Sequence, residues 1–255
     1  MPLELVTVPC LADNYAYLLH DPETGMTGVA DAPEPGPILA ALANREWRLT
    51  HIFLTHHHWD HVDGVAALQA ETEAEVWGCA ADAERLPRLD RAFSPGDKAT
   101  FGGEDVEILD VSGHTIGHIA YFFSRSLLLL SGDSLMALGC GRLFEGTPAQ
   151  MHASLTRMAA LPDATLVCSG HEYTQSNARF ALTIDPDNPE LAARAAQVDK
   201  ARAQNTPTVP STLAEEKATN PFLRAQNSAI RAHLGMETAS DTDVFAEIRA
   251  RKDRF

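Results

Sequence analysis

The sequence predicts a mixed α/β protein whose last third is helical, and three observations carry this prediction. Short apolar segments alternate with helical stretches over the first 173 residues. After residue 173 the strand signals nearly vanish, and Ala-rich, charged stretches replace them. A chain of 255 residues is also long enough for one domain plus a smaller one. We therefore expect a first domain at residues 1–173 and a helical domain at residues 174–255.

The strands of the first domain are expected where short apolar runs end at turn residues. Residues 51–55, His-Ile-Phe-Leu-Thr, form such a run and suit a buried strand. The four leucines at 127–130 favour a strand over a helix because the run is short and ends in Gly-Asp. The expected strands are residues 3–8, 15–20, 27–31, 51–55, 75–79, 106–111, 120–123, 126–131 and 165–168.

The helices are expected from their periodicity and their end signals. Residues 147–161 read as a helix with Thr147 as its N-cap and Pro148 at its first position. No apolar run approaches the roughly 20 residues that a membrane helix requires. The other expected helices are residues 37–44, 63–72, 176–183, 190–204, 228–234 and 244–252.

The net charge and the cysteines indicate which partners the protein binds and in which compartment it works. The net charge of −15 disfavours nucleic acid, and an anionic small molecule would need a local basic patch. The four cysteines are scattered without a Cys-x-x-Cys pair, which argues against a structural zinc site and against a disulfide scaffold. The first residues lack the pattern of a secretory or transit peptide. We expect a cytoplasmic monomer that binds no membrane.

The segment Thr-His-His-His-Trp-Asp-His at residues 55–61 is the strongest chemical signal in the chain. Residues two apart in an extended segment point to one side, so His56 and His58 can reach one metal ion together. As the chain turns into the next helix, Asp60 and His61 can diverge to a second ion. Imidazole and carboxylate are typical ligands of zinc and also suit iron or manganese. Packing alone does not explain four such ligands in six residues.

Three further candidate ligands each follow a glycine at the end of an expected strand. They are His114, Asp133 and His171. Glycine lets the backbone turn sharply, and polar groups at strand ends converge at one rim of a sheet. With the first cluster they make five histidines and two aspartates, enough for two ions with a bridging carboxylate.

The remaining polar residues near these motifs have more than one interpretation. His57 is expected to point away from its neighbours and to support them rather than bind metal. His118 either forms a hydrogen bond near His114 or has no role at the site, and the sequence favours neither interpretation. Asp31 either orients a metal-bound histidine or caps a turn. The other histidines are expected to be structural or exposed: His20, His51, His152 and His233.

These motifs resemble the metallo-β-lactamase superfamily and, more closely, the glyoxalase II (hydroxyacylglutathione hydrolase) family. The superfamily resemblance rests on residues 55–61 with His114, Asp133 and His171. The closer resemblance rests on later segments and covers nearly the whole chain. These are Gly-Asp-Ser at 132–134, Gly-Cys-Gly-Arg-Leu-Phe-Glu-Gly-Thr at 139–147, Gly-His-Glu-Tyr-Thr at 170–174, and residues 207–212, 220–224 and 251–253.

The resemblance implies an αββα sandwich with a metal site at one edge and a C-terminal helical domain. It implies two divalent ions, most simply zinc. His56, His58 and His114 would hold one ion, Asp60, His61 and His171 the other, and Asp133 would bridge both. Asp60 would also orient the hydroxide that attacks the substrate.

The resemblance also implies a glutathione thioester as substrate. The positions that would contact glutathione are Arg142, Phe144, Tyr173, Arg249 and Lys252. Relatives often have Lys at position 142 and Tyr at position 144. Arg142 keeps the charge with a different donor geometry, and Phe144 has no hydroxyl to donate. The residues themselves place Arg249, Arg251, Lys252 and Arg254 in a basic cluster, which suits either a helix C-terminus or an anionic ligand.

The expected reaction is hydrolysis of S-D-lactoylglutathione to glutathione and D-lactate, the second step of methylglyoxal detoxification. One alternative is an oxidoreductase with a single iron, similar to the persulfide dioxygenases of the same superfamily. Another is a metal- or glutathione-binding protein without activity. A β-lactamase is disfavoured because such enzymes generally lack the bridging aspartate, and a nuclease is disfavoured by the acidic charge.

Overall fold

A computed structural model describes residues 1–255, which fall into two compact units. The amino-terminal unit comprises Met1–Asp110 and Gly117–Gly132, and the carboxy-terminal unit comprises Val111–Ile116 and Asp133–Phe255. Residues 133–173 thus belong to the same compact unit as the helices that follow them. The expected domain boundary after residue 173 stays a prediction, and the units are described separately below.

The first sheet of the amino-terminal unit has six strands in chain order. The first three strands pair antiparallel, whereas the third to the sixth run parallel. β4 lies between parallel neighbours and is fully buried, which explains its continuous apolar run. The strands are β1 (Glu4–Cys10), β2 (Asn14–His20), β3 (Thr27–Ala30), β4 (His51–Phe53), β5 (Glu75–Cys79) and β6 (Arg91–Phe93).

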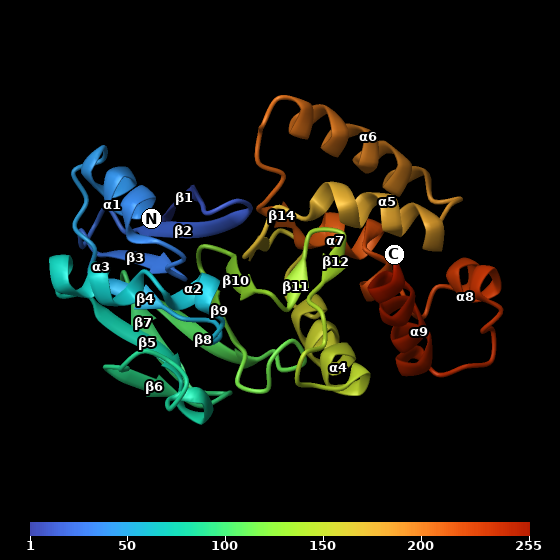
Figure 1. Cartoon of the computed structure of the whole chain (residues 1–255), viewed down its shortest axis with the longest axis horizontal. Helices are drawn as coiled ribbons and strands as arrows, with labels where there is room; N and C mark the ends of the chain where they lie inside the picture. Colours follow the sequence, from blue (N-terminus) through green and yellow to red (C-terminus); the bar gives the residue numbers. More distant parts are fainter. The chain divides into compact units, whose positions relative to one another are not determined.

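Four antiparallel strands of a second sheet belong to the same unit, and aromatic rings fill the space between the two sheets. The four strands are β7 (Lys98–Phe101), β8 (Glu104–Asp110), β9 (Ile119–Phe123) and β10 (Leu128–Gly132). The Phe53 ring of β4 lies 5.1 Å from Phe101 and 5.7 Å from Phe123, both edge-on. Helices α1 (Pro35–Ala43) and α3 (Val65–Thr72) contact each other, and the short α2 (Trp59–Val62) precedes α3 (Figure 1).

The carboxy-terminal unit is mostly helical. Its strands are β11 (Leu135–Met136), β12 (Gly139–Cys140), β13 (Leu166–Ser169) and β14 (Ser211–Thr212). Its α-helices are α4 (Pro148–Ala159), α5 (Thr174–Ile184), α6 (Pro189–Ala203), α7 (Leu213–Thr219), α8 (Ser228–Leu234) and α9 (Asp241–Arg254). Helix α4 begins as expected, with a capping box between Thr147 and Gln150 and a proline in its first turn. Figure 1 shows α5 and α6 lying side by side.

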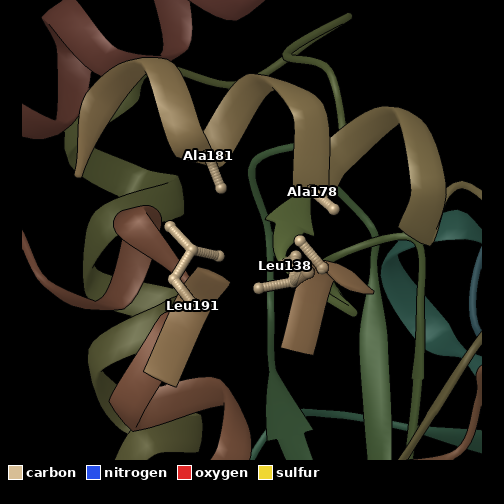
Figure 2. Close-up of a cluster of buried hydrophobic side chains, with 5 residues drawn as sticks. Leu138, Ala178, Ala181 and Leu191 are labelled. Atoms are coloured by element: carbon tan, nitrogen blue, oxygen red, sulfur yellow. The ribbon is translucent and has the colours of Figure 1, made fainter. Parts of the chain in front are cut away.

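The hairpin of β11 and β12 inserts its tip among these helices. Leu138, at φ 56°, is fully buried with Ala178, Ala181 and Leu191 (Figure 2). Its backbone N–H donates to the Glu216 carboxylate at 2.8 Å. Three hairpin carbonyls accept from amide side chains: Asn220 Nδ2 donates to Met136 O and Gly139 O, and Asn177 Nδ2 donates to Ala137 O. The helices therefore hold the hairpin by both apolar and polar contacts.

Most expected elements are confirmed, and the differences have local causes. The strand expected from residue 126 begins at Leu128, because Leu127 adopts a left-handed turn conformation with φ 52°. The helix expected at 63–72 begins at Val65 and is preceded by the separate α2. The two-residue strands β11, β12 and β14 are too short to leave a periodic signal, and β6, β7 and α7 were also not expected. None of the helices combines the length and apolar character that a membrane crossing requires.

Candidate metal centre

The histidine-rich segment of the amino-terminal unit runs extended from the end of β4 to the start of α2. His58 has φ −62° and ψ 143°, and α2 begins at the next residue. His56 Nε2 lies 3.2 Å from His58 Nδ1, so these two side chains converge as an alternating extended chain requires. His61 lies one helical turn on, and its ring centroid is 4.2 Å from that of His56.

Asp31, directly after β3, fixes the tautomer of His61. Its buried carboxylate accepts from Thr55 N at 2.9 Å, Thr55 Oγ1 at 2.9 Å and His61 Nδ1 at 2.8 Å. A carboxylate only accepts, so His61 carries its proton on Nδ1 and, when neutral, has its lone pair on Nε2. That Nε2 atom lies 3.8 Å from Asp60 Oδ2. The sequence left Asp31 either to orient a histidine or to cap a turn, and the structure shows that it orients His61.

Thr55 extends the same control to His56. Because Thr55 Oγ1 gives its proton to Asp31, it can only accept from His56 Nδ1, which lies 3.0 Å away. The neutral ring of His56 therefore also has its lone pair on Nε2. Close behind Thr55 is Gly132, with φ 50°, where a Cβ would lie 2.4 Å from Thr55 Oγ1. Only glycine fits this position, as the Gly-Asp motif suggested.

Asn14 holds Asp60 in the same way. Its side-chain amide donates to the Asp60 carbonyl at 3.0 Å and to Asp60 Oδ2 at 3.1 Å, and the residue is buried at the start of β2. The sequence reasoning missed both Asn14 and Thr55 as supporting residues. No spacing relates Asn14 to residue 60, and only the fold brings the two together.

In the carboxy-terminal unit, Asp133 lies between two histidines. Its Oδ2 is 3.2 Å from His171 Nε2 and 3.6 Å from His114 Nε2. His114 Nδ1 lies 2.7 Å from the Arg142 carbonyl, which can only accept. The neutral ring of His114 therefore turns its Nε2 lone pair towards the Asp133 carboxylate. The three side chains are buried.

Each unit, taken by itself, therefore directs an imidazole lone pair at a carboxylate oxygen, which is unfavourable without a cation. The separations are 3.8 Å for His61 with Asp60 and 3.6 Å for His114 with Asp133, too long for a hydrogen bond. Two ligands about 2 Å from one tetrahedral ion lie roughly 3.4 Å apart. The donor set of imidazoles and carboxylates and its tautomers thus fit a divalent metal site.

Two of the expected substrate residues lie directly on the candidate ligand histidines of the carboxy-terminal unit. The Tyr173 ring stacks on His171 with centroids 4.6 Å apart and an angle of 3°. The Phe144 ring lies 5.3 Å from His114. Phe144 is 62% exposed and Tyr173 is 40% exposed. Two aromatic faces are therefore accessible next to His114 and His171.

Two of the three expected basic residues share one acidic partner on α9. Asp253 Oδ1 lies 2.9 Å from Arg249 Nη2 and 3.7 Å from Arg142 Nε. Arg249 is buried, donates to the Cys140 carbonyl at 2.9 Å and lies over the Phe222 ring. A direct contact of Arg249 with substrate stays a prediction, since the structure shows its guanidinium engaged with this hairpin.

Lys252, on the same helix, is only partly exposed, whereas Arg142 is exposed. Its Nζ lies 5.2 Å from the Phe180 ring and 5.1 Å from the Phe255 ring. Partial burial, with the nearby Arg249 charge, lowers the pKa of Lys252 to about 8. Lys252 can therefore change its charge near neutral pH.

The other histidines have structural partners. His20 stacks on Trp47, and His51 is buried against Trp77 and Phe101. His152 contacts Thr242 Oγ1, and His233 contacts the Thr183 carbonyl. His118 stacks on His56, with centroids 4.7 Å apart. The structural interpretation of the first four is consistent with these contacts.

Comparisons with known proteins agree with this geometry. Residues 23–171 match the model of the metallo-β-lactamase superfamily, and residues 172–255 match that of the hydroxyacylglutathione hydrolase C-terminus. Hydroxyacylglutathione hydrolases from Ruegeria pomeroyi and Cereibacter sphaeroides are 63% and 61% identical over 255 residues, all of both chains in each case.

Solved structures show the same fold at lower identity. The B3 metallo-β-lactamase BLEG-1 is similar with a TM-score of 0.67 and 19% identity, over 86% of this chain and 99% of that one. ETHE1 from Myxococcus xanthus is similar with a TM-score of 0.65 and 25% identity, over 99% and 98%. The mixed α/β fold with a C-terminal helical region is thus that of the metallo-β-lactamases. Within this superfamily, the chain belongs to the hydroxyacylglutathione hydrolase family.

Proposed function

We propose that the protein hydrolyses the thioester of S-(2-hydroxyacyl)glutathione to glutathione and a 2-hydroxy acid. The observation that carries the proposal is the Asp133 carboxylate between His114 and His171, with the exposed rings of Phe144 and Tyr173 on those histidines. Full-length relatives with 54–63% identity are named hydroxyacylglutathione hydrolases, which supports the same reaction here. The proposed substrate is S-D-lactoylglutathione and the product D-lactate, as in the second step of methylglyoxal detoxification.

We propose two divalent ions as cofactors. His56, His58 and His114 would hold one, Asp60, His61 and His171 the other, and Asp133 both. This assignment rests on the family resemblance and on the tautomers that Asp31, Thr55 and the Arg142 carbonyl impose. Zinc is the proposed metal because its ligands are histidine and carboxylate in most such sites. Iron or manganese would suit the same ligands, and a neighbour with 25% identity, TTHA1623, was solved in a di-iron-bound form.

The side chains divide the catalytic work. When bound, the ions lower the pKa of a water molecule to about 7 and polarise the thioester carbonyl. Asp60, which Asn14 holds in place, orients the attacking water by accepting its hydrogen bond. Arg142 and Lys252 attract the glutathione carboxylates, while Phe144 and Tyr173 offer apolar faces to the thioester. Thiolate is a good leaving group, so no separate strong acid is required.

The remaining proposals concern setting and partners. All four cysteines are free and buried, which suits a reducing cytoplasm. The net charge of −15 is unfavourable for nucleic acid and suits a small-molecule substrate that a local basic group attracts. We propose a cytoplasmic monomer.

The test is thiol release from S-D-lactoylglutathione by metal-loaded protein, with a chelator-treated sample as control. We expect rapid release that the chelator abolishes and that zinc restores. Asp133→Ala and His58→Ala should lose activity by more than about 100-fold together with bound metal, since each removes a ligand. Asp163→Ala, a substitution of an exposed aspartate paired with Lys217, should retain wild-type turnover.

A protein with verified metal and no thiol release would contradict the proposal. Oxygen consumption with a glutathione persulfide would then indicate the oxidoreductase alternative. That alternative is not favoured, because the full-length relatives are named hydrolases. A protein that binds metal and glutathione but turns over neither compound would be a binding protein.

A further inference from the structure

The middle histidine of the three in the ligand segment does not point at the metal ligands. His57 Nδ1 instead lies 3.0 Å from Asp82 Oδ2, and its Nε2 lies 3.3 Å from Arg85 Nη1. Arg85 in turn donates from Nε at 2.9 Å, and also from Nη2, to Asp82 Oδ1. These three side chains form a closed ring of hydrogen bonds within the amino-terminal unit.

The ring leaves no ligand atom of His57 available. Asp82 accepts the Nδ1 proton, so the neutral imidazole has its lone pair on Nε2, and Arg85 donates to that lone pair. At His56 and His61, by contrast, Thr55 and Asp31 hold the proton on Nδ1 and the Nε2 atoms face other candidate ligands, 3.2 Å from His58 Nδ1 and 3.8 Å from Asp60 Oδ2. With three consecutive histidines, His57 would otherwise compete with its neighbours for metal.

The fold places Asp82 where it can control this segment. β4 and β5 are parallel neighbours, so their carboxyl ends lie at the same edge of the sheet. The ligand segment follows β4, while Asp82 ends the short 3₁₀ helix Ala80–Asp82 that follows β5. Asp82 is 3% exposed, and such a buried carboxylate requires its partners.

Asp82 also packs against a second segment, residues 117–119, which contacts the ligand segment. Gly117 lies so close that a Cβ there would be 2.2 Å from Asp82 Cγ. The following residues then contact the ligand segment: the His118 ring stacks on His56 at 10°, and Ile119 N donates to the Thr55 carbonyl at 3.0 Å. Asp82 therefore contacts both the ligand segment, through His57, and the segment at Gly117 that packs on it.

We propose that Asp82 and Arg85 are positioning residues that remove His57 from the ligand set and thereby hold His56 and His58 as the metal-binding pair. The proposal rests on the metal site proposed above. It predicts that Asp82 acts on metal binding principally through His57, with a smaller contribution through the segment at Gly117 and His118. Loss of a partner that orients a ligand segment typically weakens metal affinity by about 10–100-fold.

A double-mutant cycle on metal affinity tests this route. Zinc dissociation constants are measured by competition with a chromophoric chelator for the wild type, Asp82→Ala, His57→Ala and the double variant. We expect Asp82→Ala to weaken zinc binding by about 10–100-fold, and to have a much smaller effect once His57 is alanine. The cobalt-substituted Asp82→Ala protein should also show a changed visible absorption spectrum, because His57 can then enter the coordination sphere.

Two controls separate positioning from general destabilisation. Asp21 is also buried in the amino-terminal unit, but it accepts hydrogen bonds from the turn residues Glu23 and Thr24. Asp21→Ala should lower the melting temperature and leave zinc affinity unchanged. Arg85→Met, at a partly exposed side chain, serves if Asp82→Ala does not fold, and should weaken zinc binding in the same direction.

The outcomes separate this inference from the proposed function. Equal zinc affinity for Asp82→Ala and wild type, or an equal effect of Asp82→Ala with and without His57, would overturn the positioning role. Failure of the wild type itself to bind zinc, iron or manganese would instead overturn the metal site.

Discussion

The two units hold their candidate ligands by different means. In the amino-terminal unit, side chains orient side chains: Asp31 and Thr55 set the tautomers of His61 and His56, and Asn14 holds Asp60. In the carboxy-terminal unit, the backbone does this work, since His114 donates to the Arg142 carbonyl and Gly141 lies against Asp133. The first set should therefore be sensitive to polar substitutions, and the second to any change in backbone approach.

The largest effect is expected from Gly141→Ala. The new Cβ would lie 1.9 Å from the Asp133 carbonyl oxygen and 2.9 Å from His114 Nδ1. Neither contact is tolerable, so the backbone carrying both ligands must shift, at a cost of about 1–3 kcal/mol in stability. We expect metal affinity to fall by at least about 100-fold. Zinc content after dialysis against a weak chelator measures this.

The matched control is Gly36→Ala in α1. No atom lies within 4 Å of a Cβ there, and alanine favours the helix. This variant should bind zinc as the wild type does. Wild-type zinc content in Gly141→Ala would show that the backbone near His114 and Asp133 can shift without loss of metal. The carboxy-terminal unit would then not depend on close backbone contacts as we propose.

Asp31→Asn should have the next largest effect. An amide nitrogen is a donor, so one of its contacts with Thr55 or His61 would face another donor. If His61 turns its proton to Nε2, that atom no longer binds metal. We expect metal affinity to fall by about 10–100-fold with little change in the folded structure. Chelator competition and circular dichroism together measure it, and Asp21→Asn is the control, with unchanged affinity expected.

The smallest effect concerns the pH dependence of substrate binding. The pKa of Lys252 is lowered to about 8, so its ammonium is present at pH 7 and is lost as pH rises through 8. If Lys252 attracts an anionic glutathione thioester, KM should rise by about three- to fourfold between pH 7 and 9, because a partly exposed ion pair of about 1 kcal/mol is lost over most of this titration. Steady-state kinetics across this range measure KM and kcat.

Lys252→Met should show the higher KM at every pH in that range, with kcat close to that of the wild type. A steep rise of KM that persists in Lys252→Met would assign the titration to another group. Such a result would leave the aromatic rings as the principal substrate contacts in the carboxy-terminal unit.

The sequence predicted which candidate ligands converge better than it predicted the residues that support them. His56 and His58 follow from alternation in an extended segment, and Gly132 from the close approach that a strand end requires. Asn14 and Asp82 could not be predicted as supports, because their contacts join residues 46 and 25 positions apart in the chain. The role of Thr55 could not be predicted because it depends on the contact with Asp31. For Arg249, the sequence predicted a ligand contact from its charge, and the structure adds that it is buried against Cys140 and Phe222. Its contact with substrate stays a prediction.

The hairpin tip at Leu138 has a consequence for how this protein can be divided. Leu138 and the backbone groups of the hairpin are satisfied by α5, α6 and the residues around α7. A truncation after residue 173 would expose this leucine and leave those N–H and C=O groups without partners. In gene fusions, or in exchange between related genes, a junction between residues 132 and 133 preserves these contacts, whereas one at residue 173 breaks them.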